Sequence, residues 1–179
     1  MKRFVMLACV LMFAVSCDDS PTSPSNPNVA RFTAILLPGN EVPPIAAGNA
    51  DAGASGVMQL TMTVTRDAAN VITGATYDFT INVTGFPAGT TLTGAHIHTA
   101  PAGTNAGVVI GLPLVAGTDT TLATGQSTIT KTGLSSTSTA VSAAAVAQSV
   151  FNNPVGNYFN VHTSVNGGGA IRGQLVRLD

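Results

Sequence analysis

Hydrophobic and polar residues alternate with a period of two in two neighbouring stretches of the chain. Residues 58–65 place Met, Leu, Met and Val at every second position with Gln or Thr between them, and residues 77–84 alternate Tyr, Phe, Ile and Val with Asp, Thr and Asn. Successive side chains of a strand point to opposite faces, so each stretch predicts a half-buried strand. The polar residues 66–70 between them are typical of a turn. We therefore predict an antiparallel hairpin over residues 57–84.

Shorter stretches of the same kind predict the rest of the fold. Further strands are expected at residues 32–37, 93–98, 108–112, 127–130, 158–162 and 170–176. Residues 136–152 differ because their apolar residues follow a helical spacing, which predicts one short helix near residues 137–151. Many short strands with one helix are typical of a single mainly β domain. We expect an antiparallel β-sandwich or a Greek-key barrel, superoxide-dismutase-like or immunoglobulin-like.

The N-terminus has the features of a secretory signal. Lys2 and Arg3 are followed by the apolar stretch 4–15 and then, after one Ser, by Cys17. The apolar stretch is shorter than the roughly 20 residues that a membrane-spanning helix needs. A Cys directly after small residues resembles a bacterial lipobox, in which the thiol is acylated and the chain is cut just before it. We expect residues 1–17 to be a lipoprotein signal with lipidation at Cys17; the alternative is an ordinary signal peptide with an incidental Cys.

Cleavage before Cys17 has consequences for the mature chain. The other cysteine, Cys9, leaves with the signal, so no thiol remains for a disulfide, a Cys-ligated metal or a Cys nucleophile. Residues 18–30 are rich in Pro, Ser and Asn and predict a tether. Residues 31–179 then form one domain with its own core. The expected location is the bacterial cell envelope, periplasmic or on the cell surface, with the membrane reached through the lipid.

Charged residues are few. Seven Lys and Arg and eight Asp and Glu make up 8% of the chain, with a net charge of −1, where soluble domains typically have about 25%. Without Lys2 and Arg3 five basic residues face eight acidic ones, so the mature chain carries −3. This balance provides no basic surface and excludes nucleic acid as a partner.

Histidine is scarce, with three in the chain. His96 and His98 share one strand face, and Ala95 and Ile97 occupy the other, which we expect to face the core. His162 likewise stands on the non-core parity of its strand. A His-x-His pair with one distant His fits a three-nitrogen site for a single Zn²⁺ or copper ion. The alternative is a set of histidines that only form hydrogen bonds to turns and to one another.

Other polar residues share these strand faces. Tyr158 and Asn160 lie on the parity of His162, and Arg172 and Gln174 lie on the polar parity of the last expected strand. Glu41 is the one Glu of the chain. A bidentate ion pair between Arg172 and Glu41 would fix the first and last strands together, since buried charges are normally paired. The alternative is that Arg172 offers its guanidinium to an anionic ligand beside the histidines.

Four motifs in one order carry a family resemblance. They are Gly39-Asn40-Glu41-Val42-Pro43-Pro44, Ala95-His96-Ile97-His98, Tyr158-Phe159-Asn160-Val161-His162-Thr163 and Ala170-Ile171-Arg172-Gly173-Gln174-Leu175. They resemble the CHRD domain, a module of the animal protein chordin that also occurs in microbial secreted proteins. The resemblance covers residues 31–178. It departs from the family at residues 166–170, Asn-Gly-Gly-Gly-Ala, which lack the usual Pro and Glu, so an acidic neighbour of Arg172 is missing there and Glu41 gains importance.

The resemblance implies an extracellular module and supplies no reaction. We expect a lipid-anchored, non-enzymatic binding or structural module of the cell envelope, because the mature chain has no thiol, no Gly-x-Ser-x-Gly motif and one Glu. No catalytic residue is assigned. One alternative is a mononuclear Zn or Cu protein or metalloenzyme with the three histidines as ligands. Another is an adhesion or partner-capture module for an extracellular or periplasmic protein, a glycan or a small ligand, on its Thr-rich strand faces.

Overall fold

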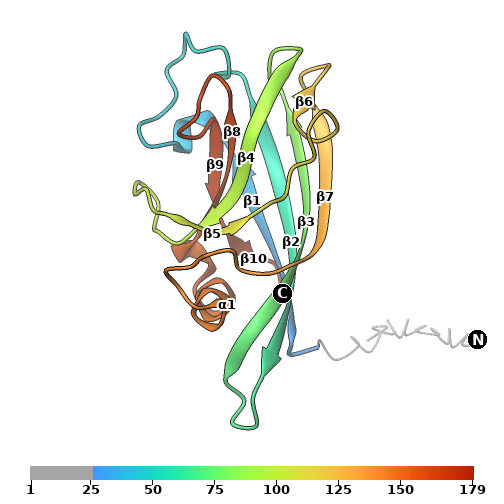
Figure 1. Cartoon of the computed structure of the whole chain (residues 1–179). Coiled ribbons are helices and arrows are strands. Elements are labelled where there is room, and N and C mark those ends of the chain that lie inside the picture. The colour runs from blue at the N-terminus through green and yellow to red at the C-terminus, as the bar shows by residue number, and fades with distance from the viewer. Residues whose placement is uncertain (1–25) are drawn as a thin grey trace, which may run out of the picture.

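The computed structural model describes residues 26–179 and contains two antiparallel sheets packed face to face, a β-sandwich that does not close into a barrel (Figure 1). The expected signal peptide, Cys17 and residues 18–25 of the expected tether lie outside the described residues. In the order β10-β1-β2-β3-β7, the first sheet contains Val176–Arg177, Val29–Leu36, Ser55–Arg66, Ile72–Thr84 and Ser127–Leu134. In the order β5-β4-β8-β9, the second contains Val108–Gly111, Thr90–His98, Tyr158–Thr163 and Ile171–Gln174, and β6 (Thr121–Leu122) pairs with β4.

The predicted hairpin is confirmed as β2 and β3. The two strands pair along their length, with Leu60 opposite Phe79 and Met58 opposite Ile81. These apolar side chains are at most 1% exposed and form the inner face of the first sheet. The turn closes as Asp67 accepts backbone N–H groups on its Oδ1, and Asn70 takes a positive φ of 65°, a conformation that Asn tolerates better than most residues. The period of two therefore predicted both the pairing partners and the buried face.

The last predicted strand, residues 170–176, is in fact two strands that belong to different sheets. β9 pairs with β8 in the second sheet, whereas β10 pairs with β1 in the first. The break falls at Leu175, whose backbone N–H bonds to Asn157 while its side chain is fully buried. Leu37 and Arg172 form an isolated antiparallel bridge with hydrogen bonds in both directions. The C-terminal chain thus joins the two sheets at one corner of the sandwich.

The predicted helix is shorter than expected. α1 spans Ala143–Asn152, and Ser142 caps it by accepting the N–H of Ala145 at 3.2 Å. The residues before it do not continue the helix because their hydroxyl and N–H groups bond elsewhere: Ser136 Oγ donates to the Val109 carbonyl and Thr137 N–H bonds to the same oxygen. Ser and Thr side chains often compete with helix formation in this way. None of the helices among residues 26–179 has the length and apolar character that crossing a bilayer requires.

The outward face of the second sheet is also covered. Ala95 and Ile97 face the core and are at most 1% exposed, as their parity predicted. On the opposite parity, Tyr158, Asn160 and Arg172 are each only 2% exposed, because the loops after β1, β4 and β8 fold over them. The second sheet therefore has an apolar inner face and a buried polar outer layer, and the histidines lie in this layer.

Candidate metal centre

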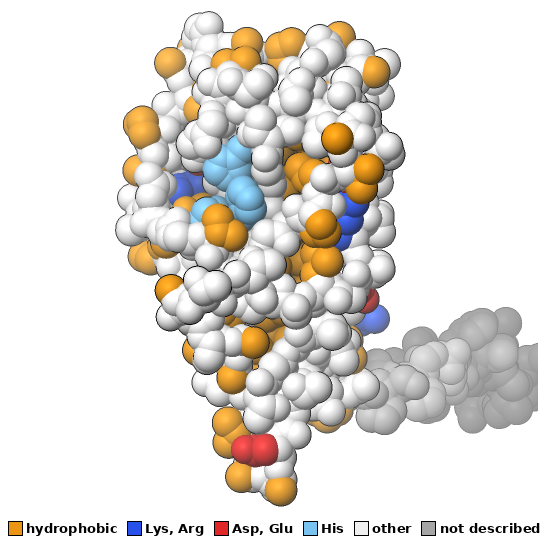
Figure 2. Space-filling model, in the orientation of Figure 1, with side chains coloured by type: hydrophobic (Ala, Val, Ile, Leu, Met, Phe, Trp, Pro, Cys, Tyr) orange, Lys and Arg blue, Asp and Glu red, His pale blue; other side chains and the backbone are white. Residues whose placement is uncertain are grey.

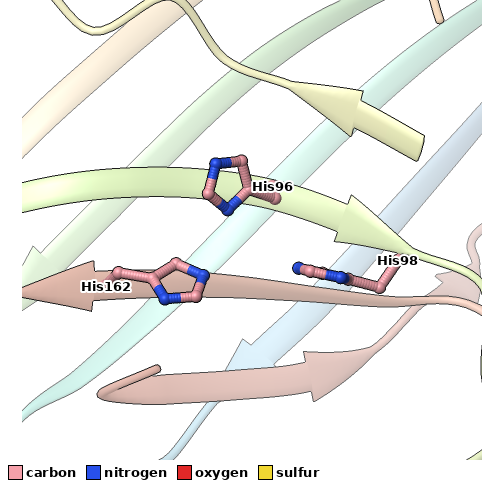
Figure 3. A group of neighbouring side chains, drawn as sticks. All are labelled: His96, His98 and His162. Atoms are coloured by element: carbon pink, nitrogen blue, oxygen red, sulfur yellow. The ribbon is translucent and has the colours of Figure 1, made fainter. Parts of the chain in front are cut away.

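Three histidines from two neighbouring strands converge on the outer face of the second sheet (Figure 3). His96 and His98 come from β4 and His162 from β8, and the pairing places Gly94 opposite His162 and His96 opposite Asn160. One nitrogen of each ring lies within 4.8 Å of the corresponding nitrogens of the other two. The strand parity that grouped these histidines in the sequence thus brings their side chains together in the structure.

Two of the rings are oriented by backbone carbonyl groups. His98 donates its Nδ1–H to the Ala106 carbonyl at 2.8 Å, and His162 donates its Nδ1–H to the Gly167 carbonyl at 3.0 Å. A carbonyl oxygen only accepts, so the proton of each neutral ring is on Nδ1 and a lone pair remains on Nε2. Metal-binding histidines commonly have their second nitrogen held in this way. Both Nε2 atoms are therefore in the state that a metal ion requires.

Asn160 brings a further oxygen to the same point. Its Oδ1 lies 3.0 Å from Nε2 of His98 and 3.0 Å from Nε2 of His162. Since both Nδ1 protons are already used, two lone pairs face a carbonyl oxygen with no proton between them. The conflict is removed if the amide turns its NH₂ group toward the rings, or if a cation lies between the three atoms. With the amide oxygen facing the rings, the cluster therefore has an excess of electron-pair donors.

His96 supplies the third nitrogen. Its Nδ1 is buried and has no hydrogen-bond partner, whereas buried polar atoms nearly always have one. The His96 ring lies edge-on to both other rings, with centroids 4.8 Å from His162 and 5.7 Å from His98. In Figure 3 one of its nitrogens points into the gap between these two rings. An unpartnered nitrogen aimed at two further lone pairs is the arrangement expected of a metal ligand set.

Burial keeps two of the three rings in the neutral form. It lowers the pKa of His96 to about 4, and the neighbouring His162 and His98 lower it further in the same direction. Burial also lowers the pKa of His162, against the opposing effect of its hydrogen bond to Gly167. Desolvation disfavours the charged form of an imidazole. These two rings are therefore neutral at neutral pH, which is the ligand form of histidine.

The dimensions of the cluster fit a small ion after a modest closure. A tetrahedral Zn²⁺ with Zn–N bonds of about 2.0–2.1 Å separates its nitrogen ligands by about 3.4 Å. The widest pair here, at no more than 4.8 Å, must close by about 1.4 Å at most, which side-chain torsion rotation achieves. His96 and His162 are only partly buried, and Figure 2 shows the histidine side chains at the surface of this face. An ion can thus enter from solvent.

Arg172 and Glu41 lie close together, but not in the bidentate geometry that the sequence suggested. The single contact is from Arg172 Nε to Glu41 Oε2 at 3.9 Å. Arg172 Nε donates instead to the Asn40 carbonyl at 2.6 Å, and burial raises the pKa of Glu41 to about 7 against the opposing effect of Arg172. The loop after β1 approaches Arg172 mainly through its backbone, so Asn40 takes the position expected for the carboxylate.

The other polar residues predicted near the histidines divide into two groups. Tyr158 stacks on His98 with ring centroids 4.7 Å apart and planes within 5°, and Asn160 contacts two histidines as described. Gln174 instead donates to the carbonyls of Ala100, Val155 and Asn157. Tyr158 and Asn160 therefore belong to the cluster, whereas Gln174 ties together the loops beside it.

Some residues that shape the cluster gave no signal in the sequence. Asp51 is fully buried, and its Oδ2 accepts hydrogen bonds from Thr163 and Asn166 at 2.6 Å each. These bonds hold the loop that carries Gly167, the acceptor for His162. The acceptors at Ala106 and Gly167 are backbone carbonyl oxygens, which every residue has, so the residue type does not identify them.

The comparison with protein families identifies the chain. The profile of the CHRD domain matches residues 32–175. The protein belongs to the CHRD domain family. The match spans both sheets, the three histidines and Arg172, and it confirms the resemblance carried by the four motifs. Searches among curated proteins and among solved structures found no match.

Proposed function

We propose that this CHRD-domain protein is a lipid-anchored module of the cell envelope that binds one transition-metal ion through His96, His98 and His162. One observation carries the metal proposal: two rings are held by backbone carbonyls with their Nε2 lone pairs turned to a common point, where the buried Nδ1 of His96 has no partner. The unpartnered Nδ1 of His96, rather than the mere proximity of the histidines, favours a metal site over a hydrogen-bond network.

The donor set selects the class of ion. Three imidazole nitrogens suit Zn²⁺ and copper, whereas Ca²⁺ and Mg²⁺ take oxygen ligands. Asn160 Oδ1 is the nearest oxygen, at 3.0 Å from two of the nitrogens, and can complete a four-coordinate site. The proposed role is to bind the ion, and no catalytic step is assigned to it.

Isothermal titration with Zn²⁺ and Cu²⁺ tests the proposal, with protein purified without a polyhistidine tag. We expect one ion per chain, and a loss of affinity of at least about 100-fold in the His96→Ala/His98→Ala variant, since removal of an outer-shell partner alone costs about 10- to 100-fold. A Gln59→Ala variant, on the exposed face of β2, is the control and should bind normally. Absence of heat with both ions would refute the metal site.

The membrane attachment rests on the N-terminal sequence. Lys2, Arg3, the apolar stretch 4–15 and Cys17 have the order of a lipoprotein signal. Mass spectrometry of protein extracted from its native membrane should find a chain that begins at an acylated Cys17. A Cys17→Ser variant should move to the soluble fraction, and retention of that variant in the membrane would contradict the anchor.

A further inference from the structure

Arg172 is the largest side chain among the fully buried ones, at 2% exposed, and its contacts lead toward the metal centre rather than to Glu41. Its Nη1 donates to the Thr104 carbonyl at 3.3 Å and to Asn105 Oδ1 at 2.9 Å. Its guanidinium carbon lies 4.5 Å from the centroid of the Tyr158 ring. The guanidinium thus holds both the loop after β4 and the aromatic ring beside it.

Each of these partners acts on His98. Tyr158 stacks in parallel on the His98 ring, and its hydroxyl accepts the N–H of Ala106 at 3.3 Å. The carbonyl of the same Ala106 accepts the Nδ1–H of His98 at 2.8 Å. Arg172, Tyr158 and His98 therefore form one stack, and residues 104–106 form a second route from Arg172 to the same imidazole.

The two routes fix different properties of His98. The stack sets the plane of the ring, and the Ala106 carbonyl sets which nitrogen carries the proton. Together they direct the Nε2 lone pair of His98 at His96 and His162. Lysine cannot replace this function, because a planar guanidinium both stacks on an aromatic ring and donates in a fixed fork, whereas an ammonium group does neither.

We propose that Arg172 is a positioning residue for the metal ligand His98, acting through Tyr158 and the 104–106 loop; the proposal rests on the metal-binding function above. Arg172 does not contact the ion. Three observations support this role. Arg172 is buried, its contact with Glu41 is weak at 3.9 Å, and it donates hydrogen bonds to the loop after β4. The ion pair with Glu41 is then secondary to the orientation of the imidazole.

The test compares three variants with the wild-type protein. Arg172→Lys replaces the planar guanidinium with an ammonium group. Asn105→Ala removes the side-chain oxygen that accepts from Arg172. Tyr158→Phe removes the hydroxyl that accepts from Ala106 but keeps the aromatic ring between Arg172 and His98. The last two preserve the buried charge, so they remain informative if Arg172→Lys fails to fold. Gln148→Ala is the control, because Gln148 makes a comparable hydrogen bond elsewhere: its amide donates to the Ile72 carbonyl at 2.8 Å and joins α1 to β3.

Two readouts separate positioning from general stability. Zn²⁺ affinity, measured by competition with a chelator, should fall about 10- to 100-fold in each variant, as for other outer-shell partners, and stay unchanged in Gln148→Ala. Long-range ¹H–¹⁵N NMR of the metal-free protein should find His98 protonated on Nδ1 in the wild type and in mixed tautomers in Asn105→Ala and Tyr158→Phe.

The outcomes distinguish this proposal from the one on which it rests. If the wild type binds neither Zn²⁺ nor Cu²⁺, the metal function fails, and the tautomer of His98 alone decides whether Arg172 positions the ring. If the wild type binds metal and the folded variants keep both its affinity and the Nδ1–H tautomer, the positioning role is overturned while the metal function stands.

Discussion

Gly94 lies directly against the imidazole of His96. A Cβ atom at position 94 would be 2.5 Å from Cε1 and 3.0 Å from Nε2 of that ring, closer than van der Waals contact allows. The two residues are two apart on β4, so their side chains share the face that carries the cluster. The absence of a side chain at position 94 therefore leaves the space that the His96 ring occupies.

The first prediction follows from this contact. Gly94→Ala should displace the His96 ring and weaken Zn²⁺ binding by about 10-fold, as for other changes that disturb ligand orientation, with little loss of stability because a side chain rather than backbone must move. Isothermal titration and urea denaturation measure the two effects. Gly111→Ala is the control, since its Cβ would lie at an ordinary 3.7 Å from His96 Cδ2. Equal affinities in both variants would contradict the prediction.

The second prediction concerns the pH dependence of stability. The pKa of Glu41 is about 7 in the folded protein, raised from 4.5 mainly by burial. The folded state therefore binds more protons than the unfolded state between these values, and the contribution of Glu41 to stability is complete below pH 4.5 and is lost as pH rises through 7. The loss is about 3 kcal/mol at 1.36 kcal/mol per pKa unit.

Glu41→Gln isolates this effect because Gln does not titrate. Unfolding in urea at several pH values should show the wild type losing about 2.5 kcal/mol relative to Glu41→Gln between pH 5 and pH 8. Arg172 is the charged group that faces Glu41. A difference between the two proteins that does not change with pH would show that Glu41 keeps an ordinary pKa.

The histidine cluster could be predicted from the sequence because strand parity shows which face of a strand a residue occupies. Strand geometry fixes side-chain parity, so the alternation around Ala95 and Ile97 was enough to group His96 and His98 away from the core. The start of α1 was misplaced because the competing hydrogen bonds of Ser136 join segments far apart in the chain. Likewise, the strand predicted over residues 170–176 is divided, because its two halves pair with different sheets.

The immediate surroundings of the histidines were the least predictable part. The atoms that set their tautomers are the carbonyls of Ala106 and Gly167, and every residue has a carbonyl, so no pattern of residue types marks them. Tyr158 and Asn160 were found because they share a parity with His162. The covering of this face by three loops is a tertiary property, and it turned an apparently open polar face into a buried one.

The third prediction tests the loop that orients His162. Asp51→Ala leaves Thr163 Oγ1 and Asn166 Nδ2 without their buried acceptor. We expect a loss of about 3 kcal/mol in the free energy of unfolding, the upper end for hydrogen bonds to charged groups, together with weaker Zn²⁺ binding. Asp67→Ala, in the exposed turn after β2, is the matched control and should cost under about 1 kcal/mol. If the Asp51→Ala variant is as stable as the wild type, Asp51 does not hold the loop that orients His162.

The fourth prediction concerns the corner where the sheets join. A Cβ at Gly173 would lie 2.1 Å from the backbone oxygen of Ile35, and a strand backbone cannot move aside as a side chain can. Gly173→Ala should therefore separate β9 from β1 and destabilise the protein by about 3 kcal/mol or more, at the upper end for overpacking. Gly39→Ala, whose added Cβ would meet nothing within 4 Å, is the control in the same urea experiment.

The same corner also affects metal binding. Arg172 precedes Gly173 and forms a β-bridge with Leu37, and Arg172 is the residue that orients His98. Any folded Gly173→Ala protein should therefore bind Zn²⁺ more weakly. Wild-type stability in this variant would mean that the corner is looser than the contact with Ile35 requires.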